Sequence, residues 1–257
     1  MYHEFAYLYD EFMDDIPYEK WLANLLDILK SYGCDDGLVC ELGCGTGNMT
    51  ELLAGEGYDM IGIDASEDML EVAREKLYDM EWEDEPPILY LEQDMRELEL
   101  FGTVKAFVSV CDSMNYLTTE EDILTTLKLV NNYLDPQGLF IFDMKTDYFY
   151  RKLGQNTLGD VRDDIAYVWD NDYDTENHIN TYVLTMFEKD EDGKYIRSEE
   201  IHRQKSYSVE TIAGLIEKAG MSLEKVLDAE NMQAPTKETE RYIFVAREKR
   251  QEGKLYV

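Results

Sequence analysis

The stretch ELGCGTGN, Glu41 to Asn48, places three glycines at alternate positions directly after the apolar run GLVC. A short apolar run that ends in glycine is typical of a buried strand followed by a tight turn. The next residues, NMTELLAGEG, have a helical pattern that stops at glycine. In such a unit, glycine lets backbone amides approach a ligand at the carboxyl end of a parallel sheet. The sequence therefore predicts a cofactor site at this loop.

Further apolar runs alternate with helical segments along the chain and predict the rest of one sheet. The runs are YDMIGIDAS, ILYLEQDM, VKAFVSVCDSMNYL, GLFIFDM, MSLEKVLDAE and RYIFVAREK, and the helical segments are YEKWLANLLDILK, SEDMLEVAREKLYDM, EEDILTTLKLVNNYLDPQG and SVETIAGLIEKAG. Strands that alternate with helices in this way form a parallel sheet covered on both faces. We expect an α/β fold with a Rossmann-like, seven-stranded, mostly parallel sheet, and helix starts at Ser66 and Ser208.

The pattern changes between residues 147 and 205, after the fifth predicted strand. Alternating segments such as IAYVWDND and HINTYVLTMFEK follow one another there, with EDGK as a hairpin turn. These features predict an antiparallel β insertion over the edge of the main sheet. Residues 1–146 and 206–257 then form the main domain with an N-terminal helical lid, and residues 147–205 form a second lid.

The composition limits the partners of the protein. Its 257 residues include 24 Lys and Arg against 56 Asp and Glu, a formal net charge of -32, which disfavours nucleic acid and anionic membrane surfaces. No apolar stretch reaches the roughly 18 residues of a membrane span, and the N-terminus lacks a signal-peptide pattern. Neither the four cysteines nor the acids have the spacing of a disulfide framework or metal site. We expect a cytoplasmic protein without a metal.

Acidic residues after the second and third predicted strands suit a nucleoside. Asp64, 17 residues after Gly47, can accept hydrogen bonds from both hydroxyls of a ribose. Asp94 offers an acceptor for an exocyclic amine, beside a backbone donor at Met95 for a ring nitrogen. These features suit adenosine. Simpler roles also exist, because Asp64 could be a helix N-terminal acid and Asp94 could cap a turn.

The segments ELGCGTGN, GIDASEDML, EQDMREL and CDSMNYL, in this order, resemble the class I S-adenosylmethionine-dependent methyltransferases. The resemblance covers residues 38–144 and the helix and strands after Ser208, and it implies an enzyme with S-adenosylmethionine as cofactor. In that family Glu41 and the glycine backbone would hold the methionyl end, and the Cys111 backbone would line it. The cofactor-binding positions that the resemblance implies are Tyr9, Glu41, Gly43, Cys44, Gly45, Gly47, Asp64, Ala65, Met69, Asp94, Met95 and Cys111.

The N-terminal FAYLYDEFM, YEKW and the insertion are similar to small-molecule N- or O-methyltransferases of the glycine N-methyltransferase-like kind, and to uncharacterised bacterial methyltransferases. This similarity implies a small-molecule methyl acceptor beneath the insertion, with Tyr9 in the lid over the cofactor. Tyr9 could instead pack against Trp21, and Met69 could be an ordinary core residue.

The candidates for catalysis follow the fourth strand and lie in the insertion. Methyl transfer is an in-line displacement that needs alignment and exclusion of water more than a strong base. Asp112 is a candidate to orient or deprotonate the acceptor, with Ser113 and Asn115 as partners, and His202 is a second candidate base. CDSMNYL departs from the Asp/Asn-Pro-Pro-Tyr pattern of enzymes that methylate nucleic-acid amines or protein amides, which disfavours those substrates.

Other functions fit parts of the pattern. A nicotinamide-dependent oxidoreductase could use the same topology, although Asn48 replaces the third glycine of the dinucleotide fingerprint and a Tyr-x-x-x-Lys is missing from the expected place. A non-catalytic protein that senses S-adenosylmethionine would leave the same cofactor motifs. Transfer to a protein side chain would need an open pocket.

Overall fold

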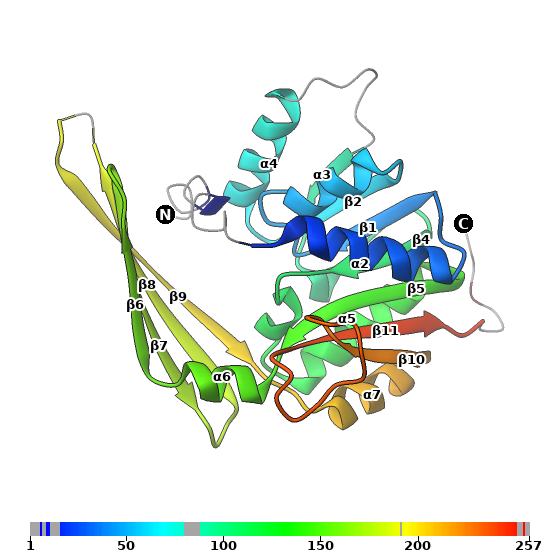
Figure 1. The fold of residues 1–257 in the computed structure, drawn as a ribbon. Coiled ribbons are helices and arrows are strands. Elements are labelled where there is room, and N and C mark those ends of the chain that lie inside the picture. Colours follow the sequence, from blue (N-terminus) through cyan, green and yellow to red (C-terminus); the bar gives the residue numbers. More distant parts are fainter. Residues whose placement is uncertain are drawn as a thin grey trace.

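The computed structural model describes residues 6, 9–10, 16–79, 88–190, 192–250 and 254, which form two sheets and the helices around them (Figure 1). The helices are α2 (Tyr18–Ser31), α3 (Asn48–Gly55), α4 (Glu67–Asp79), α5 (Glu120–Tyr133), α6 (Asp147–Leu153) and α7 (Val209–Lys218), with 3-10 turns η1 (Met95–Glu97) and η2 (Ser113–Tyr116). The strands are β1 (Leu38–Leu42), β2 (Asp59–Asp64), β3 (Ile88–Glu92), β4 (Val104–Ser109), β5 (Leu134–Lys145), β6 (Asn156–Val161), β7 (Ile165–Asp174), β8 (Ile179–Lys189), β9 (Tyr195–Lys205), β10 (Met221–Asp228) and β11 (Arg241–Glu248).

The main sheet has seven strands in the order β10-β11-β5-β4-β1-β2-β3. Strands β1 to β5 pair in parallel, whereas β11 runs antiparallel to both of its neighbours. The predicted Rossmann-like fold is therefore confirmed. The chain moves from β1 to one side through β2 and β3, and then to the other side through β4 and β5. The carboxyl ends of β1 and β4 meet at this switch point, where open α/β sheets bind ligands.

Apolar side chains on both faces of the main sheet hold the helices in place. Leu22, Leu25 and Leu29 of α2 recur at helical spacing and are buried with Leu53 of α3 against one face. Helices α5 and α7 cover the opposite face, where Phe142 stacks on Phe244 with ring centroids 5.1 Å apart. The rigid sheet fixes the positions of the loops at its carboxyl edge.

The predicted helix starts are confirmed by their caps. Ser208 accepts a hydrogen bond from the Thr211 amide at 3.1 Å, and Ser66 accepts one from the Met69 amide at 3.4 Å. Each serine satisfies an amide that the first turn of a helix leaves without an internal partner.

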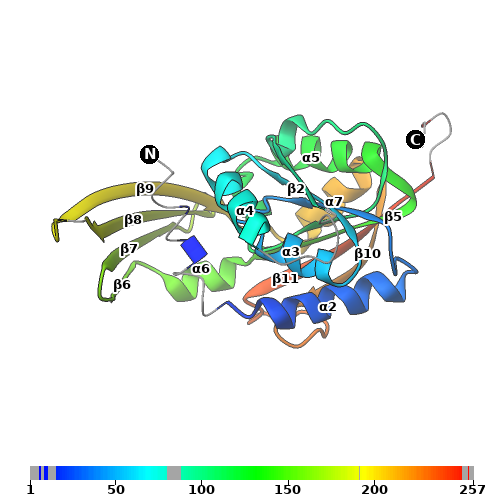
Figure 2. The same cartoon turned by 90° about the horizontal axis from the view of Figure 1, so that it is seen from above.

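The insertion consists of helix α6 followed by a four-stranded antiparallel sheet, β6-β7-β8-β9. Helix α6 lies in a stretch that the alternating pattern predicted as β structure throughout. Thr146 caps it through the Phe149 amide, and Gly154 ends it in the left-handed region at φ 61°. Other helices cover both faces of the main sheet. The inserted sheet forms a separate, curved layer beside α4 (Figure 2).

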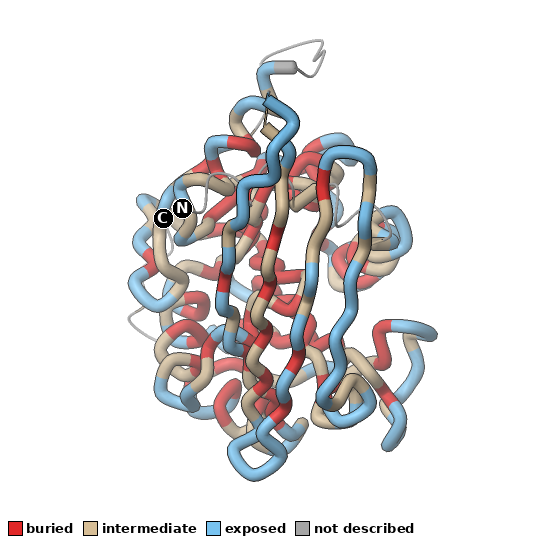
Figure 3. The backbone as a smooth tube through the Cα atoms, turned by 90° about the vertical axis from the view of Figure 1, so that its left-hand side faces the viewer, coloured by how far each residue is buried: buried red, intermediate tan, exposed pale blue. Residues whose placement is uncertain are grey.

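The sequence analysis placed the insertion over the edge of the main sheet. The inserted sheet instead lies over the carboxyl ends of the main strands, because residues of both line one cavity. Buried and partly buried residues alternate along β8 (Figure 3), so one face of the inserted sheet turns toward the main domain. The Asn115 amide joins the two sheets, because it donates to the carbonyls of Lys145 and Lys205 at 3.1 and 2.8 Å.

Parts of the N-terminal lid and of the hairpin turn predicted from the sequence fall outside the described residues. These parts are residues 1–5, 7–8 and 11–15 of the N-terminal lid and Glu191 of the hairpin turn. Among the helices that the structure does describe, none has the length and apolar character needed to cross a membrane.

Candidate active site

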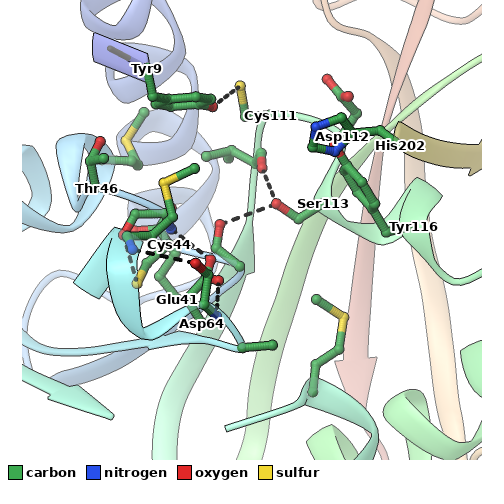
Figure 4. A pocket seen from close by; sticks show the side chains of 18 of the residues that line it. Tyr9, Glu41, Cys44, Thr46, Asp64, Cys111, Asp112, Ser113, Tyr116 and His202 are labelled. Carbon is green, nitrogen blue, oxygen red and sulfur yellow. Dashed lines mark hydrogen bonds between the residues drawn. The ribbon is translucent and has the colours of Figure 1, made fainter. Parts of the chain in front are cut away.

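A cavity of about 790 Å³ lies between the carboxyl ends of the main strands and the inner face of the inserted sheet. Its wall includes every predicted cofactor residue except Gly47, and also Asp112 and His202. The cavity has two sides, with Cys111 and Ser113 between them (Figure 4). Glu41, Cys44 and Asp64 gather on one side, and Tyr116 and His202 on the other.

The three loop glycines are required for different reasons. All have positive φ, which disfavours any side chain. A Cβ on Gly43 would lie 2.6 Å from the Cβ of Ser113, and a Cβ on Gly47 would collide with the Tyr90 hydroxyl. A Cβ on Gly45 would meet no protein atom within 4 Å, and Gly45 lines the cavity. Packing within the protein explains Gly43 and Gly47, and Gly45 alone of the three leaves open space for a ligand.

Asp64 holds the glycine loop against the end of β2. Its Oδ2 accepts a hydrogen bond from the Gly45 amide at 2.8 Å, and its Oδ1 accepts one from the Ser66 amide at 2.9 Å. Burial raises the pKa of Asp64, although these amides act in the opposite direction. Each carboxylate oxygen can accept a second hydrogen bond, so Asp64 keeps acceptor capacity for the ribose hydroxyls that the sequence analysis expects here.

Glu41 is a buried acid beneath the same loop. It is 2% exposed, and Thr50 donates a hydrogen bond to its Oε2. Burial raises the pKa of Glu41 to about 8, and the neighbouring Asp64 charge acts in the same direction. A buried carboxyl of this kind gains most from a cation. The α-ammonium of a methionyl group has the required charge.

Asp94 caps the turn η1, which was the simpler of its two predicted roles. It accepts from the Arg96 amide at 2.8 Å and from the Arg96 Nε at 2.9 Å, and its other oxygen pairs with the same guanidinium. The hydrogen bonds from Arg96 lower the pKa of Asp94. Asp94 and Met95 line the cavity, so an adenine amine would share this carboxylate with Arg96.

The N-terminal residues Tyr9 and Asp10 line or adjoin the side of the cavity that contains Glu41, Cys44 and Asp64. The Asp10 carboxylate accepts from Thr46 Oγ1 at 2.6 Å and Asn48 Nδ2 at 2.8 Å, and it pairs with Lys76 Nζ at 3.1 Å. The Tyr9 hydroxyl lies 4.0 Å from Cys111 Sγ (Figure 4). The sequence analysis missed Asp10, because its partners are 36 to 66 residues away.

Tyr9 and Met69 also contact the inserted sheet. Both pack against its apolar cluster of Ile165, Leu184 and Met186. The alternative partner of Tyr9, Trp21, instead contacts Tyr18 and the Arg241 guanidinium. Tyr9 and Met69 therefore combine packing with a place in the cavity wall.

Asp112 lies in the site, but its surroundings disfavour a role as a base. Its Oδ1 accepts from Arg241 at 2.8 Å, and its Oδ2 accepts from Gln204 at 2.6 Å and Lys145 at 3.1 Å. Burial raises the pKa of Asp112, but Lys145 and Arg241 outweigh it, so the pKa lies below its ordinary value. Asp143 accepts from Arg241 at 2.7 Å and completes this buried group of two acids and two cations. Asp112 thus fixes the cations in place.

His202 is better arranged to accept a proton. Its Nδ1 lies 3.2 Å from the Tyr116 hydroxyl and its Nε2 lies 3.0 Å from Glu200 Oε2. With the proton on Nε2, the ring donates to Glu200 and accepts from Tyr116, which satisfies both contacts. Tyr116 is 47% exposed and lines the cavity, and Glu200 is buried behind the ring.

Several residues of this side were not predicted from the sequence. They are Tyr116, Lys145, Tyr182, Glu200, Gln204 and Arg241. Glu200 and His202 are two positions apart on a predicted strand, so they had to share a face. That spacing was the available signal, and the other residues meet only through the tertiary fold.

Comparisons with known proteins agree with this geometry. Residues 39–138 match the family described as a methyltransferase domain. A Geobacillus sp. (strain WCH70) protein, named as a methyltransferase, is 32% identical over 96% of this chain and 99% of its own length. The chain belongs to the class I S-adenosylmethionine-dependent methyltransferase family.

Two further members of this family are informative. The crystal structure of an S-adenosylmethionine-dependent methyltransferase from Clostridium acetobutylicum has a TM-score of 0.82 and 26% identity, over 97% of this chain and 99% of that one. A dTDP-3-amino-3,4,6-trideoxy-α-D-glucopyranose N,N-dimethyltransferase from Streptomyces venezuelae is 28% identical over 49% of this chain and 50% of its own. The cofactor of this methyltransferase is S-adenosylmethionine, as the sequence predicted, and the oxidoreductase and non-catalytic alternatives are wrong.

Proposed function

We propose that this methyltransferase acts on an amine or hydroxyl of a small molecule bound beneath the inserted sheet. The observation that supports this proposal is one continuous cavity, which extends from the glycine loop to the inner face of that sheet. The roof formed by residues 147–205 leaves room for a compact acceptor and disfavours a polymer. The relative that acts on an amino sugar, by its name, favours an amine.

The cofactor side would bind S-adenosylmethionine through groups that are already in place. Asp64 would accept from the ribose hydroxyls, Glu41 would pair with the methionyl ammonium, and the open space beside Gly45 would admit the chain between them. Tyr9 and Asp10 would cover this side of the bound molecule and exclude water. When bound, S-adenosylmethionine supplies a methyl group on a sulfonium, and the electron pair of the broken S–CH3 bond stays on sulfur.

Tyr116 and His202, on the opposite side of the cavity (the acceptor side), would remove a proton from the nucleophile. Tyr116 would pass its own proton to Nδ1 of His202 as it receives the proton of the acceptor amine or hydroxyl. Glu200 would stabilise the imidazolium that results, as a positioning residue. The lone pair freed on the acceptor then forms the new bond to the methyl carbon. We expect His202→Gln to lower kcat by about 10²- to 10⁴-fold.

A labelling experiment tests this function. The purified protein is incubated with methyl-labelled S-adenosylmethionine and a cell extract that has been separated into small molecules, protein and nucleic acid. We expect label in the small-molecule fraction, little label with His202→Gln, and none with Asp64→Ala. Label confined to protein or nucleic acid would overturn the proposal.

A further inference from the structure

The floor of the acceptor side contains a largely buried ammonium group. Lys145, at the end of β5, has a side chain 17% exposed and lines the cavity. Its Nζ lies 3.1 Å from Asp112 Oδ2, and 5.0 and 5.7 Å from the ring centroids of Phe149 and Tyr182. An ammonium has three N–H donors, and one carboxylate contact uses a single donor. The rings of Phe149 and Tyr182 flank the ammonium, and Asp112 is its one carboxylate partner among the described residues.

The hydroxyl of Tyr182 lies beside this ammonium, which can only donate, so the phenol proton has no acceptor among the described residues. Tyr182 is 3% exposed and lines the same cavity. Burial raises the pKa of its phenol, although Lys145 acts in the opposite direction, so the hydroxyl is a donor at neutral pH. Buried polar groups without a partner are rare because each costs about 1–3 kcal/mol. Such a group in a cavity wall points to a ligand atom.

The carboxylates that contact Lys145 and Arg241 are already engaged. Asp112 accepts from Lys145, Arg241 and Gln204, and Asp143 accepts from Arg241. Glu200 contacts His202 through Oε2, and its Oε1 has no partner among the described residues, but Glu200 is not part of the cavity wall. Asp112 and Asp143 therefore neutralise the two cations, and the donors of Lys145 and Tyr182 remain in excess at the cavity wall. An excess of donors around a desolvated ammonium suits an oxyanion.

The register of the inserted sheet places this floor next to the proton acceptor. Tyr182 of β8 and His202 of β9 are direct partners in an antiparallel pair. The Cβ atoms of such partners lie about 5 Å apart on the same face. A ligand that reaches both side chains has its oxyanion and its nucleophile separated by only a few bonds.

We propose that Lys145 and Tyr182 bind an oxyanion, a carboxylate or a phosphate, on the methyl acceptor. The acceptor is then a compact amine or alcohol that carries this anion close to its nucleophile. This inference rests on the proposed function, because it assigns the substrate class of the same cavity.

Matched probes and a conservative variant test the inference. The probes are alanine with its uncharged amide, and phosphoethanolamine with ethanolamine, each titrated calorimetrically into protein saturated with S-adenosylhomocysteine. We expect at least one anionic probe to bind about ten-fold or more tightly than its neutral counterpart, and the pair that does so separates carboxylate from phosphate. In Tyr182→Phe we expect the anionic probe to lose about ten-fold in affinity, as expected for a hydrogen bond to a charged group.

The folding control is built into this variant. Because the Tyr182 phenol proton has no acceptor among the described residues, Tyr182→Phe should keep or raise the melting temperature of the free protein. Anionic probes that bind no better than neutral ones, no binding by any anionic probe, or unchanged affinity in Tyr182→Phe would each overturn the inference. Failure of S-adenosylhomocysteine to bind would instead overturn the proposed function.

Discussion

The pKa of Glu41 predicts how cofactor affinity depends on pH. In the free protein this carboxyl is buried, and its pKa is about 8, so it is mostly protonated near neutral pH. Binding of the methionyl ammonium requires the ionised form, and the carboxyl must release its proton as the complex forms. For one such group, affinity should increase about 16-fold from about pH 6.5 to about pH 8, and by a further factor of about two before it levels off above about pH 9.

The assay is calorimetric titration with S-adenosylhomocysteine over this pH range, in buffers of different ionisation enthalpy that report the proton released. Glu41→Gln is the matched control, because it keeps the shape of the side chain and removes its titration. We expect weaker binding and a flat pH profile in this variant. An affinity of the unmodified protein that is independent of pH, with no proton release, would refute the reasoning.

The same pKa has a consequence for stability. The folded-state pKa of Glu41 lies above its ordinary value of 4.5, so its contribution to stability is fully present below about pH 4.5 and is lost as the pH rises through about 8. We expect Glu41→Gln to gain stability relative to the unmodified protein over that range, measured as the difference in free energy of unfolding by urea. A constant difference would argue that Glu41 is not buried as described.

Three further substitutions have expected outcomes. Gly43→Ala should lower the melting temperature more than Gly45→Ala, because only the first substitution clashes with Ser113. Gly45→Ala should weaken the binding of S-adenosylhomocysteine more than its effect on stability explains. Equal effects of the two substitutions in both assays would contradict this. Arg241→Met should cost about 3–5 kcal/mol in urea unfolding, since it leaves buried carboxylates without their cation, and a loss below about 1 kcal/mol would show that the acids are hydrated. Asp10→Asn should speed S-adenosylhomocysteine dissociation in stopped-flow displacement by about ten-fold, and an unchanged rate would show that the contacts of Asp10 do not retain the ligand.

The main fold could be predicted because local patterns and sheet topology agree. Apolar runs, caps such as Ser208 and the loop after β1 each specify the same parallel sheet. Helix α6 was missed although Thr146 and Gly154 bracket it, because seven residues are too few for a helical period to stand out from alternating segments.

The cofactor side was more predictable than the acceptor side for a physical reason. Residues such as Glu41 and Asp64 end consecutive strands, so their proximity follows from topology. Lys145 ends β5 and Arg241 begins the antiparallel β11, and their pairing with Asp112 depends on tertiary packing between residues 33 to 129 positions apart. The glycines show a further limit, since the neighbours that require Gly43 and Gly47 are Ser113 and Tyr90 and not the ligand.

The most direct test of the account is a crystal structure of the protein with S-adenosylhomocysteine. The account predicts the ribose against Asp64, the homocysteine end beside Gly45 and Glu41, and the sulfur facing Tyr116 and His202 across the cavity. A sulfur that points away from the inserted sheet, or a ligand bound outside this cavity, would contradict it.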